Sequence, residues 1–384
     1  RDRSPSRGLG DVYKRQTLLT SLAAASGLAL AGCAQSGAGA QETGAPTASP
    51  SSADPATSEA PTFAPARAIE EGDRAVVAVT AATMWIDPNA PREGVDEPSL
   101  GRPVDLAGWN ARMGDAAGRK WLLGKIDSQA AVGSPVEVDE VHGDWAKVAF
   151  LDQPDPGDDP RGMVGWVPAV QLVHDERFSH VAEHADTAIV SADRAVVRTQ
   201  PSGGEDLLAV SFETRLPLLE EKDGAVRVAL PDAEDGWLSA DAVKILRRGE
   251  TLPQPTADEV IATGKRFLGL PYLWAGVTSY GFDCSGFTYS IFRHHGVELP
   301  RDSGPQMRES GFPAVELEDL QPGDLLFFHF KARPESIRHV AVYVGDGKIL
   351  HSPETGKTVE IVTLESYDTG NTYEGAVRPP FKRA

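Results

Sequence analysis

The spacing of the apolar residues changes near residue 250, and this change divides the chain into parts that must fold differently. Between Arg67 and about residue 250, short runs of Val, Ile and Leu are broken by Gly, Pro and Asp, which is typical of all-β modules. After Thr256 the spacing becomes helical, and after Asp324 it becomes strand-like. Helices followed by an antiparallel sheet predict an α+β domain over 251–384, preceded by small β barrels.

A weak internal repeat divides the β-rich part into two. Residues Gly165–Leu172 read GWVPAVQL, and residues Gly236–Val243 read GWLSADAV. Each copy predicts a strand that carries a Gly-Trp pair, with the indole covering the core of a small barrel. The repeat looks like tandem bacterial SH3-like domains, which we expect over 67–175 and 176–250.

The first 33 residues have the pattern of an export signal. Lys14 and Arg15 precede an uncharged apolar run, Leu18–Leu30, which is short for a bilayer span but long enough for the core of a signal peptide. The run ends in Leu-Ala-Gly-Cys at Cys33, which resembles the lipobox of bacterial lipoproteins. That resemblance implies a lipid on Cys33 and an extracytoplasmic protein anchored to the bacterial cell membrane. The alternative is a plain secretory signal with an incidental cysteine.

Composition limits what surrounds the folded part. From Ala34 to Ala66, 27 of 33 residues are Ala, Gly, Pro, Ser or Thr, so 34–66 is predicted to be a disordered linker.

The formal net charge of −19 argues against the clustered basic surface that a nucleic-acid-binding protein needs, so we expect no nucleic acid partner. Two cysteines cannot build a disulfide scaffold. We expect a monomer.

Cys284 is placed where a cysteine becomes reactive. A capping box, Thr256 to Glu259, begins one helix, and Cys284 begins the next, which ends before Gly296. At a helix N-terminus the unpaired amides and the macrodipole favour the thiolate, so we expect the pKa of Cys284 to lie below the usual value of about 8.5. Cys284 is therefore a candidate nucleophile.

Two of the nine histidines are candidates for its base. His339 and His351 lie on two predicted strands that Gly345-Asp346-Gly347 joins. If this turn leaves Val344 opposite Lys348, the two histidines share one face of the sheet. A slip of one residue would place His351 on the other face.

Five ordered motifs resemble the NlpC-type papain-like cell-wall cysteine peptidases, over essentially all of 256–384. They are Pro271–Gly276 (PYLWAG), Phe282–Phe287 (FDCSGF), Pro300–Ser303 (PRDS), Leu320–Leu325 (LQPGDL) and His339–Gly345 (HVAVYVG). The resemblance implies a papain-like fold with a triad of Cys284, His339 and His351, and no cofactor or metal. It also implies hydrolysis of the bond between γ-D-glutamate and a diamino acid in peptidoglycan stem peptides.

The order of linker, two SH3-like modules and this domain resembles the γ-D-glutamyl-L-diamino acid endopeptidases that act on free muropeptides with an exposed L-Ala amine. The resemblance implies a substrate groove lined by Tyr272, Asp283, Ser285 and Ser303. An acid of the first SH3-like module, matched here by Asp127, would help Asp283 hold the amine. The chain departs from the subgroup at Asp127, where Glu is favoured, and at Met163, near the place of a partner tyrosine. It departs from the family at Ala275, where glycine is usual.

Arg301 and Asp302 complete the predicted substrate-binding residues. The guanidinium of Arg301 has the geometry to meet a substrate carboxylate with two hydrogen bonds. Pairing of Arg301 with Asp302 or Glu298 is the structural alternative.

The predicted chemistry is nucleophilic. Cys284 attacks the carbonyl carbon of the γ-glutamyl amide, His339 takes the thiol proton and passes it to the leaving amine, and water releases the acyl-enzyme. The backbone amide of Cys284 is the predicted oxyanion donor. Two alternatives stay open: an amidase or acyltransferase that uses the same pair, and a non-catalytic cell-wall-binding lipoprotein.

Overall fold

The computed structural model describes residues 61–382. The predicted leader, the predicted lipidation site at Cys33 and most of the predicted linker lie outside these residues. Within residues 61–382, no helix combines the length and the apolar character that crossing a membrane requires.

Two seven-stranded antiparallel sheets precede the C-terminal domain. The first contains β1 (Arg74–Val77), β2 (Ala81–Trp85), β3 (Ile126–Ala131), β4 (Pro135–His142), β5 (Trp145–Phe150), β6 (Met163–Pro168) and β7 (Leu172–Val173). The second contains β8 (Asp186–Val190), β9 (Arg194–Arg198), β10 (Asp206–Ser211), β11 (Arg215–Lys222), β12 (Ala225–Val228), β13 (Gly236–Ser239) and β14 (Val243–Leu246). Their orders are β3-β2-β6-β5-β4-β1-β7 and β10-β9-β13-β12-β11-β8-β14. The topology is the same, so the predicted repeat of two all-β modules is confirmed.

Short helices join and extend these modules. They are η2 (Glu97–Ser99), α1 (Leu106–Arg112), α2 (Ala116–Lys120), η3 (Ala169–Gln171), α3 (Glu176–His184) and η4 (Ala240–Ala242). The connection between the two sheets is α3, which begins after Asp175. The Asp175 side chain accepts a hydrogen bond from the Phe178 amide at 2.8 Å, and the Phe178 ring lies in the core of the second module.

The Gly-Trp pairs lie on the equivalent strands β6 and β13, but their indoles do not fill the barrels. Because side chains alternate across a strand, Val167 and Leu238 enter the two cores. Trp166 and Trp237 point the other way and remain partly exposed. Each preceding glycine is needed because a Cβ there would collide with a core side chain of a neighbouring strand. The expectation that tryptophan covers the core is therefore wrong.

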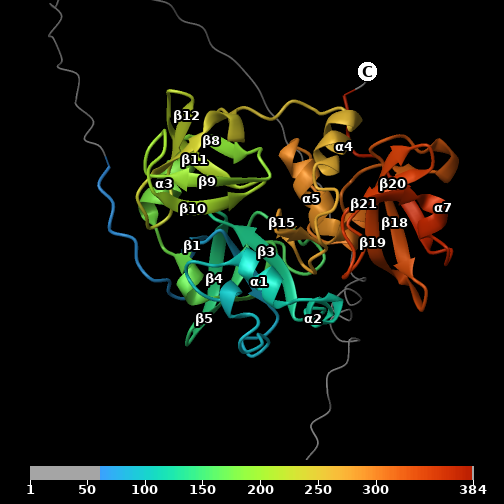
Figure 1. The fold of residues 1–384 in the computed structure, drawn as a ribbon, viewed down its shortest axis with the longest axis horizontal. Coiled ribbons are helices and arrows are strands. Elements are labelled where there is room, and N and C mark those ends of the chain that lie inside the picture. Colours follow the sequence, from blue (N-terminus) through green and yellow to red (C-terminus); the bar gives the residue numbers. More distant parts are fainter. Residues whose placement is uncertain (1–60, 383–384) are drawn as a thin grey trace, which may run out of the picture. The chain divides into compact units, whose positions relative to one another are not determined.

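The C-terminal domain packs helices on a six-stranded antiparallel sheet of order β17-β22-β18-β19-β20-β21. Its strands are β17 (Ala314–Val315), β18 (Leu325–Phe330), β19 (Arg333–Gly345), β20 (Lys348–His351), β21 (Glu360–Thr363) and β22 (Tyr373–Val377), with a separate hairpin of β15 (Val277–Thr278) and β16 (Gly281–Phe282). Its helices are α4 (Ala257–Lys265), α5 (Cys284–His294), α6 (Ser303–Arg308), η5 (Leu317–Asp319) and α7 (Leu364–Tyr367). Helices α4 and α5 cover one face, and α7 lies against the other (Figure 1). The predicted α+β fold is confirmed.

The pairing of β19 with β20 decides whether two histidines meet. Lys348 pairs with Gly345 at the turn, and not with Val344 as predicted. An irregularity in the pairing absorbs this extra residue, so the ladder beyond it has the predicted alignment. His339 and His351 consequently lie on the same face of the sheet, close enough to share a hydrogen bond.

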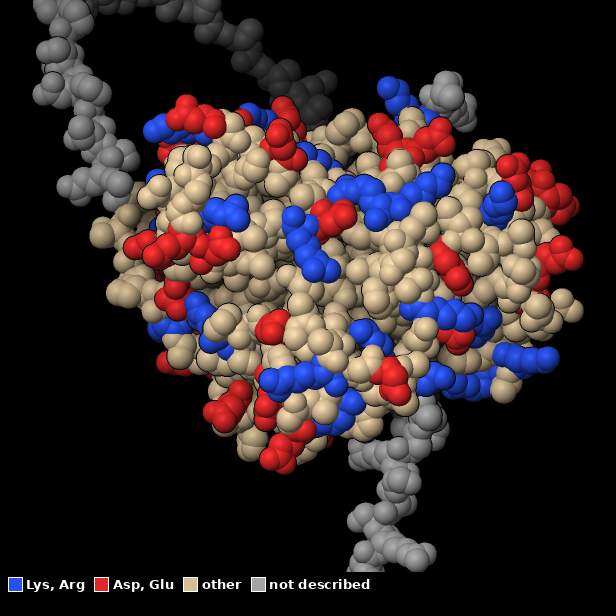
Figure 2. Space-filling view, viewed as in Figure 1, with Lys and Arg blue, Asp and Glu red and all other residues tan. Residues whose placement is uncertain are grey.

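Opposite charges neutralise one another locally, although the whole chain carries a net charge of −19. On the face shown in Figure 2, Lys and Arg side chains are interspersed with Asp and Glu. Arg161, for example, forms ion pairs with Glu137, Asp139 and Asp159. On this face the acidic residues are thus interspersed with basic ones and do not form one continuous acidic patch.

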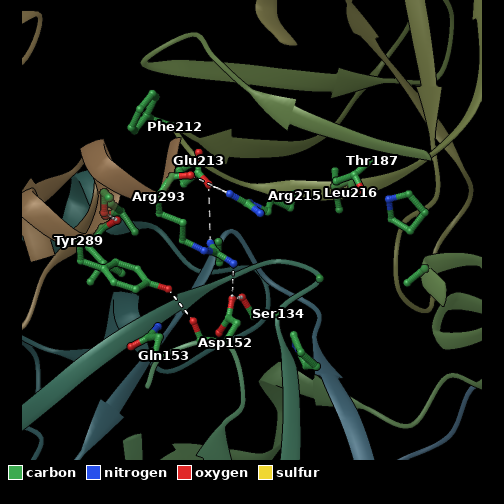
Figure 3. Close-up of a pocket in the computed structure, with 18 of the residues that line it drawn as sticks. Ser134, Asp152, Gln153, Thr187, Phe212, Glu213, Arg215, Leu216, Tyr289 and Arg293 are labelled. Carbon is green, nitrogen blue, oxygen red and sulfur yellow. Dashed lines mark hydrogen bonds and ion pairs between the residues drawn. The ribbon is translucent and has the colours of Figure 1, made fainter. Parts of the chain in front are cut away.

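A buried ionic network joins both β modules to the C-terminal end of α5 (Figure 3). Glu213, between β10 and β11, accepts a hydrogen bond from His294 at 2.8 Å and lies 2.6 Å from Arg215. Arg293 donates to Asp152 of the first module at 3.1 Å. The network borders a cavity of about 300 Å³. All three folded parts therefore meet at one end of α5.

We expect Glu213→Gln to destabilise the protein by about 3–5 kcal/mol at pH 7, because it removes the charge that compensates buried cations. Burial alone would raise the pKa of Glu213, but the hydrogen bond from His294 and the charges of Arg215 and Arg293 lower it to about 2. A carboxylate with a lowered pKa loses its stabilising contribution as the pH falls. The difference in the free energy of unfolding between Glu213→Gln and wild type should therefore become smaller as the pH falls from 4.5 to 2.

Urea denaturation at several pH values measures this difference. Glu220→Gln, which changes an exposed glutamate of β11, is the matched control and should leave stability within about 0.5 kcal/mol of wild type. Equal stability of Glu213→Gln and wild type at pH 7 would contradict the view that the charge of Glu213 compensates buried cations.

Candidate active site

Cys284 is the first residue of α5, and the preceding Asp283 sets its position. The Asp283 side chain accepts a hydrogen bond from the Gly286 amide at 2.6 Å, which caps the helix. A Cβ at Gly286 would collide with the carbonyl oxygen of Gly276, so glycine lets the first turn of α5 approach the loop before β15. The close approach leaves Cys284 only 8% exposed.

The sulfur of Cys284 lies beside the strand that carries His339. Backbone N–H groups of Val340 and Ser285 donate to it. Burial raises the pKa of the thiol to about 12, and the charge of Asp283 adds to this effect. The expectation of a lowered pKa is therefore wrong, because desolvation outweighs the N–H groups at the start of α5. At neutral pH Cys284 is a thiol that needs a base.

His339 and His351 are both buried, and their rings share a hydrogen bond. His339 Nε2 and His351 Nδ1 are 2.9 Å apart. Burial lowers the pKa of His339 well below 6.5, and the charges of His351 and Arg338 act in the same direction. Burial also lowers the pKa of His351 to about 3, assisted by Lys357 and Arg338. Both rings are neutral at pH 7, so His339 has a lone pair with which to accept a proton.

Tyr367 and Arg338 hold this pair and were not predicted from the sequence. The Tyr367 ring lies against both imidazoles, with centroids 5.1 Å from His339 and 4.7 Å from His351. Arg338 donates to the Tyr367 hydroxyl at 3.0 Å. Arg338 directly precedes His339 in the sequence, but Tyr367 comes from α7, and no motif marked it.

Arg301 is buried beside the start of α5 and does not face solvent. It has no exposed surface, and its guanidinium donates to Asp283 at 2.8 Å and to Ser285 at 2.9 Å. Its Nε donates to Ser128 of β3 at 2.9 Å. An ion pair with Asp302, 3.6 Å away, is secondary. The expected contact with a substrate carboxylate is therefore replaced by a role in holding Asp283.

The predicted acid of the first module lies near the same site. Asp127 is the neighbour of Ser128 in β3 and is half-buried. Asp155, from the loop between β5 and β6, has a pKa raised to about 7 by burial, with further contributions from the charges of Asp302 and Asp127. Acidic side chains of the first module and of the C-terminal domain thus face one another.

The remaining predicted groove residues surround the start of α5. Tyr272 is buried and pairs with Phe282 in a short parallel bridge, and Ser285 is the second residue of α5. Asp302 is the N-cap of α6, and Ser303 is its first residue. These side chains come from segments on both sides of Cys284.

Two departures from the expected patterns have structural explanations. Ala275 has a φ of 60°, a left-handed conformation that costs a residue with a Cβ about 1–2 kcal/mol. This explains why the family favours glycine there. Met163 lies in the core of the first module, so it fills space in that core and does not line the groove.

A histidine pair elsewhere was overlooked in the sequence. His180 and His184 lie on α3 with Glu183 between them, a spacing that also occurs in metallopeptidases. Their ring centroids are 4.2 Å apart. Residues 61–382 hold no group of three or more His, Cys, Asp or Glu side chains placed to bind a metal ion. The pair belongs to the connection between the β modules and not to the domain of Cys284.

Comparison with known families and relatives assigns the chain. The profile of the NlpC/P60 family matches residues 269–378, and that of the YKFC SH3b2 domain matches residues 190–245. A Bacillus cereus protein named gamma-D-glutamyl-L-lysine dipeptidyl-peptidase is 41% identical over 320 residues, which are 83% of this chain and 94% of that protein. This chain belongs to the NlpC/P60 family. The predicted resemblance is confirmed, and the chain is a cysteine peptidase of that family.

Other NlpC/P60 relatives extend the similarity beyond the peptidase domain. A Bacillus subtilis protein with the same name is 38% identical over 284 residues, or 74% of this chain and 91% of that protein. The crystal structure of an NlpC/P60 family protein from Bacillus cereus matches with a TM-score of 0.75 at 41% identity, over 80% of this chain and 99% of that one. The β modules and the NlpC/P60 domain therefore share one arrangement with that structure.

We expect alkylation of Cys284 by iodoacetamide to accelerate about tenfold per pH unit between pH 7 and 9. The thiolate is the reactive form, and while the pH is below the pKa the thiolate fraction grows about tenfold with each unit of pH. The rate is measured by mass spectrometry of the peptide that contains Cys284. A rate that is already constant between these pH values would show that a thiolate exists at neutral pH and would contradict the raised pKa.

Proposed function

We propose that this NlpC/P60 peptidase hydrolyses the bond between γ-D-glutamate and a diamino acid, with Cys284, His339 and His351 as its triad. The observation that carries the proposal is a hydrogen-bonded histidine pair beside a buried thiol at a helix start. The names of the two Bacillus relatives refer to a γ-D-glutamyl-L-lysine bond. Those names favour this bond over an amidase or acyltransferase reaction.

The reaction proceeds through a thioester. Cys284 Sγ attacks the carbonyl carbon of the γ-glutamyl amide while its proton passes to His339. His339 gives this proton to the nitrogen of the diamino acid, the C–N bond breaks and the amine leaves. Water then attacks the thioester with His339 as base, and the proton returns to the sulfur. Because thiol and imidazole are both neutral beforehand, proton transfer accompanies the attack.

The backbone around Cys284 stabilises the charge that develops. The Cys284 amide in the first turn of α5 is the proposed donor to the oxyanion, since N–H groups at a helix start point toward this position. Asp283 and Arg301 keep that turn in place through the cap and the buried ion pair. His351 orients the ring of His339.

The acids around the groove favour a substrate with a free amine. A peptidase that releases an N-terminal dipeptide has to accommodate the amine of its first residue, and buried cationic groups need a negative partner. We place this amine near Asp127 and Asp302, because the carboxylate of Asp283 already pairs with Arg301. The first SH3-like module would thus contribute directly to substrate recognition.

The sequence before residue 61 would place the enzyme at the membrane. A lipid on Cys33 and the 34–66 linker would hold the peptidase outside the bacterial cell membrane, within reach of peptidoglycan peptides. The lipobox motif that ends at Cys33 supports this localisation.

The full-length protein should release L-Ala-γ-D-Glu from the tripeptide L-Ala-γ-D-Glu-L-Lys, as followed by mass spectrometry. Cys284→Ala should reduce the rate to background. Cys33→Ala is the matched cysteine control, and it should keep peptidase activity while losing membrane association. Equal rates for wild type and Cys284→Ala would contradict the catalytic proposal, and equal cleavage of tripeptide and intact sacculi would contradict the preference for free peptides.

Asp127→Asn should raise KM for the tripeptide about tenfold or more, since a hydrogen bond between charged groups contributes about 1.5–3 kcal/mol. Its kcat should change little. The N-acetylated tripeptide lacks the charged amine, so the substitution should not affect its cleavage. Asp144→Asn, at an exposed aspartate of the same module, is the control. An unchanged KM in Asp127→Asn would remove Asp127 from amine recognition.

A further inference from the structure

One nitrogen of the histidine pair is buried without a hydrogen-bond partner among residues 61–382. This atom is His351 Nε2, on the side of the ring opposite the nitrogen that meets His339. The His351 side chain has no exposed surface. A buried N–H that lacks an acceptor is costly, so we expect an acceptor beside this nitrogen.

Glu360 is the carboxylate that faces this nitrogen. It lies directly opposite His351 in the pairing of β21 with β20, so the two side chains share one face of the sheet. Glu360 Oε1 is 3.7 Å from His351 Nε2, just beyond hydrogen-bond distance. The Glu360 side chain is 36% exposed, and its carboxylate can rotate toward the ring without disturbing the strand.

The chemistry at Cys284 determines which nitrogens carry protons. His339 Nε2 is engaged with His351, so Nδ1 is the atom left to accept the thiol proton. In the neutral ring of His339, Nδ1 must then carry no proton, so the one ring proton lies on Nε2. His339 consequently donates to His351 Nδ1, and the one proton of His351 lies on Nε2. That N–H points toward Glu360.

We propose that Glu360 is a positioning residue for this peptidase. Its carboxylate accepts the Nε2–H of His351 and thereby sets the protonation pattern and the orientation of both histidines. Glu360 touches neither the substrate nor the sulfur, so it acts through His351. The inference rests on the proposed function, because it takes His339 as the base.

Glu360 also opposes the positive charges around the pair. The charges of Arg338, in β19, and of Lys357, in the segment before β21, act on both rings, and Tyr367 of α7 covers them. The thiol of Cys284 lies at the start of α5. When His339 takes up the thiol proton, the carboxylate of Glu360 stabilises the resulting positive charge against these two cations. Its removal should make the imidazolium harder to form.

Kinetics on the L-Ala-γ-D-Glu-L-Lys tripeptide test the proposal in the full-length protein. Glu360→Ala should lower kcat about tenfold, the lower end of the loss that follows removal of the partner that orients a metal-bound histidine, and leave KM nearly unchanged. Glu360→Gln should retain more activity, because its amide oxygen can still accept the Nε2–H. In both variants the acid limb of the kcat/KM profile should move to lower pH. Glu365→Gln, an exposed glutamate of α7, is the matched control and should behave as wild type.

A second measurement is independent of the substrate. In ¹⁵N NMR of histidine-labelled protein, wild type should carry protons on Nε2 of both His339 and His351, and Glu360→Ala should mix the tautomers of His351. A wild type with this pattern that does not cleave the tripeptide would overturn the proposed function but support the pairing with Glu360. A proton on His351 Nδ1 in wild type, or a Glu360→Ala variant with unchanged kcat, pH profile and tautomers, would overturn the inference.

Discussion

The buried ion pair between Asp283 and Arg301 is the interaction on which the candidate active site depends. Asp283 caps α5 through the Gly286 amide, and Arg301, which has no exposed surface, lies 2.8 Å from the same carboxylate. The guanidinium also donates from Nε to Ser128 of the first β module. Removal of one partner of such a pair leaves an uncompensated buried charge. The first turn of α5, and with it Cys284, is therefore coupled to the docking of the first module.

Helix α5 connects this site to the rest of the protein. Its first residue is the candidate nucleophile, and its last two, Arg293 and His294, enter the ionic network formed with Asp152 and Glu213 of the two β modules. The helix has no freedom to shift at either end without breaking a buried charge pair. The β modules thus help to hold the helix that carries Cys284, in addition to any part in substrate recognition.

Predictions from the sequence were correct for features that follow from a local pattern. They were wrong for properties that depend on how deeply a side chain is buried. The repeat of the Gly-Trp strands predicted two equivalent modules, and the turn at Gly345 predicted that two histidines share a face. The pKa of Cys284 was predicted in the wrong direction, because a sequence shows a helix start but not how completely the sulfur is removed from water. Arg301 was assigned to a substrate for the same reason, since its partner Asp283 lies 18 residues away and only the fold brings them together.

The sequence by itself determined the fold class, the order of the modules, the family and the identity of the candidate nucleophile and histidines, because these follow from periodicity and from short motifs. Only the tertiary structure decided the environment of those residues. Tyr367, Glu360 and Ser128 come from separate segments, and none carries a local signal. Their contacts with the site depend on how strands and helices distant in sequence pack, and packing sets the desolvation and the charges that control each proton.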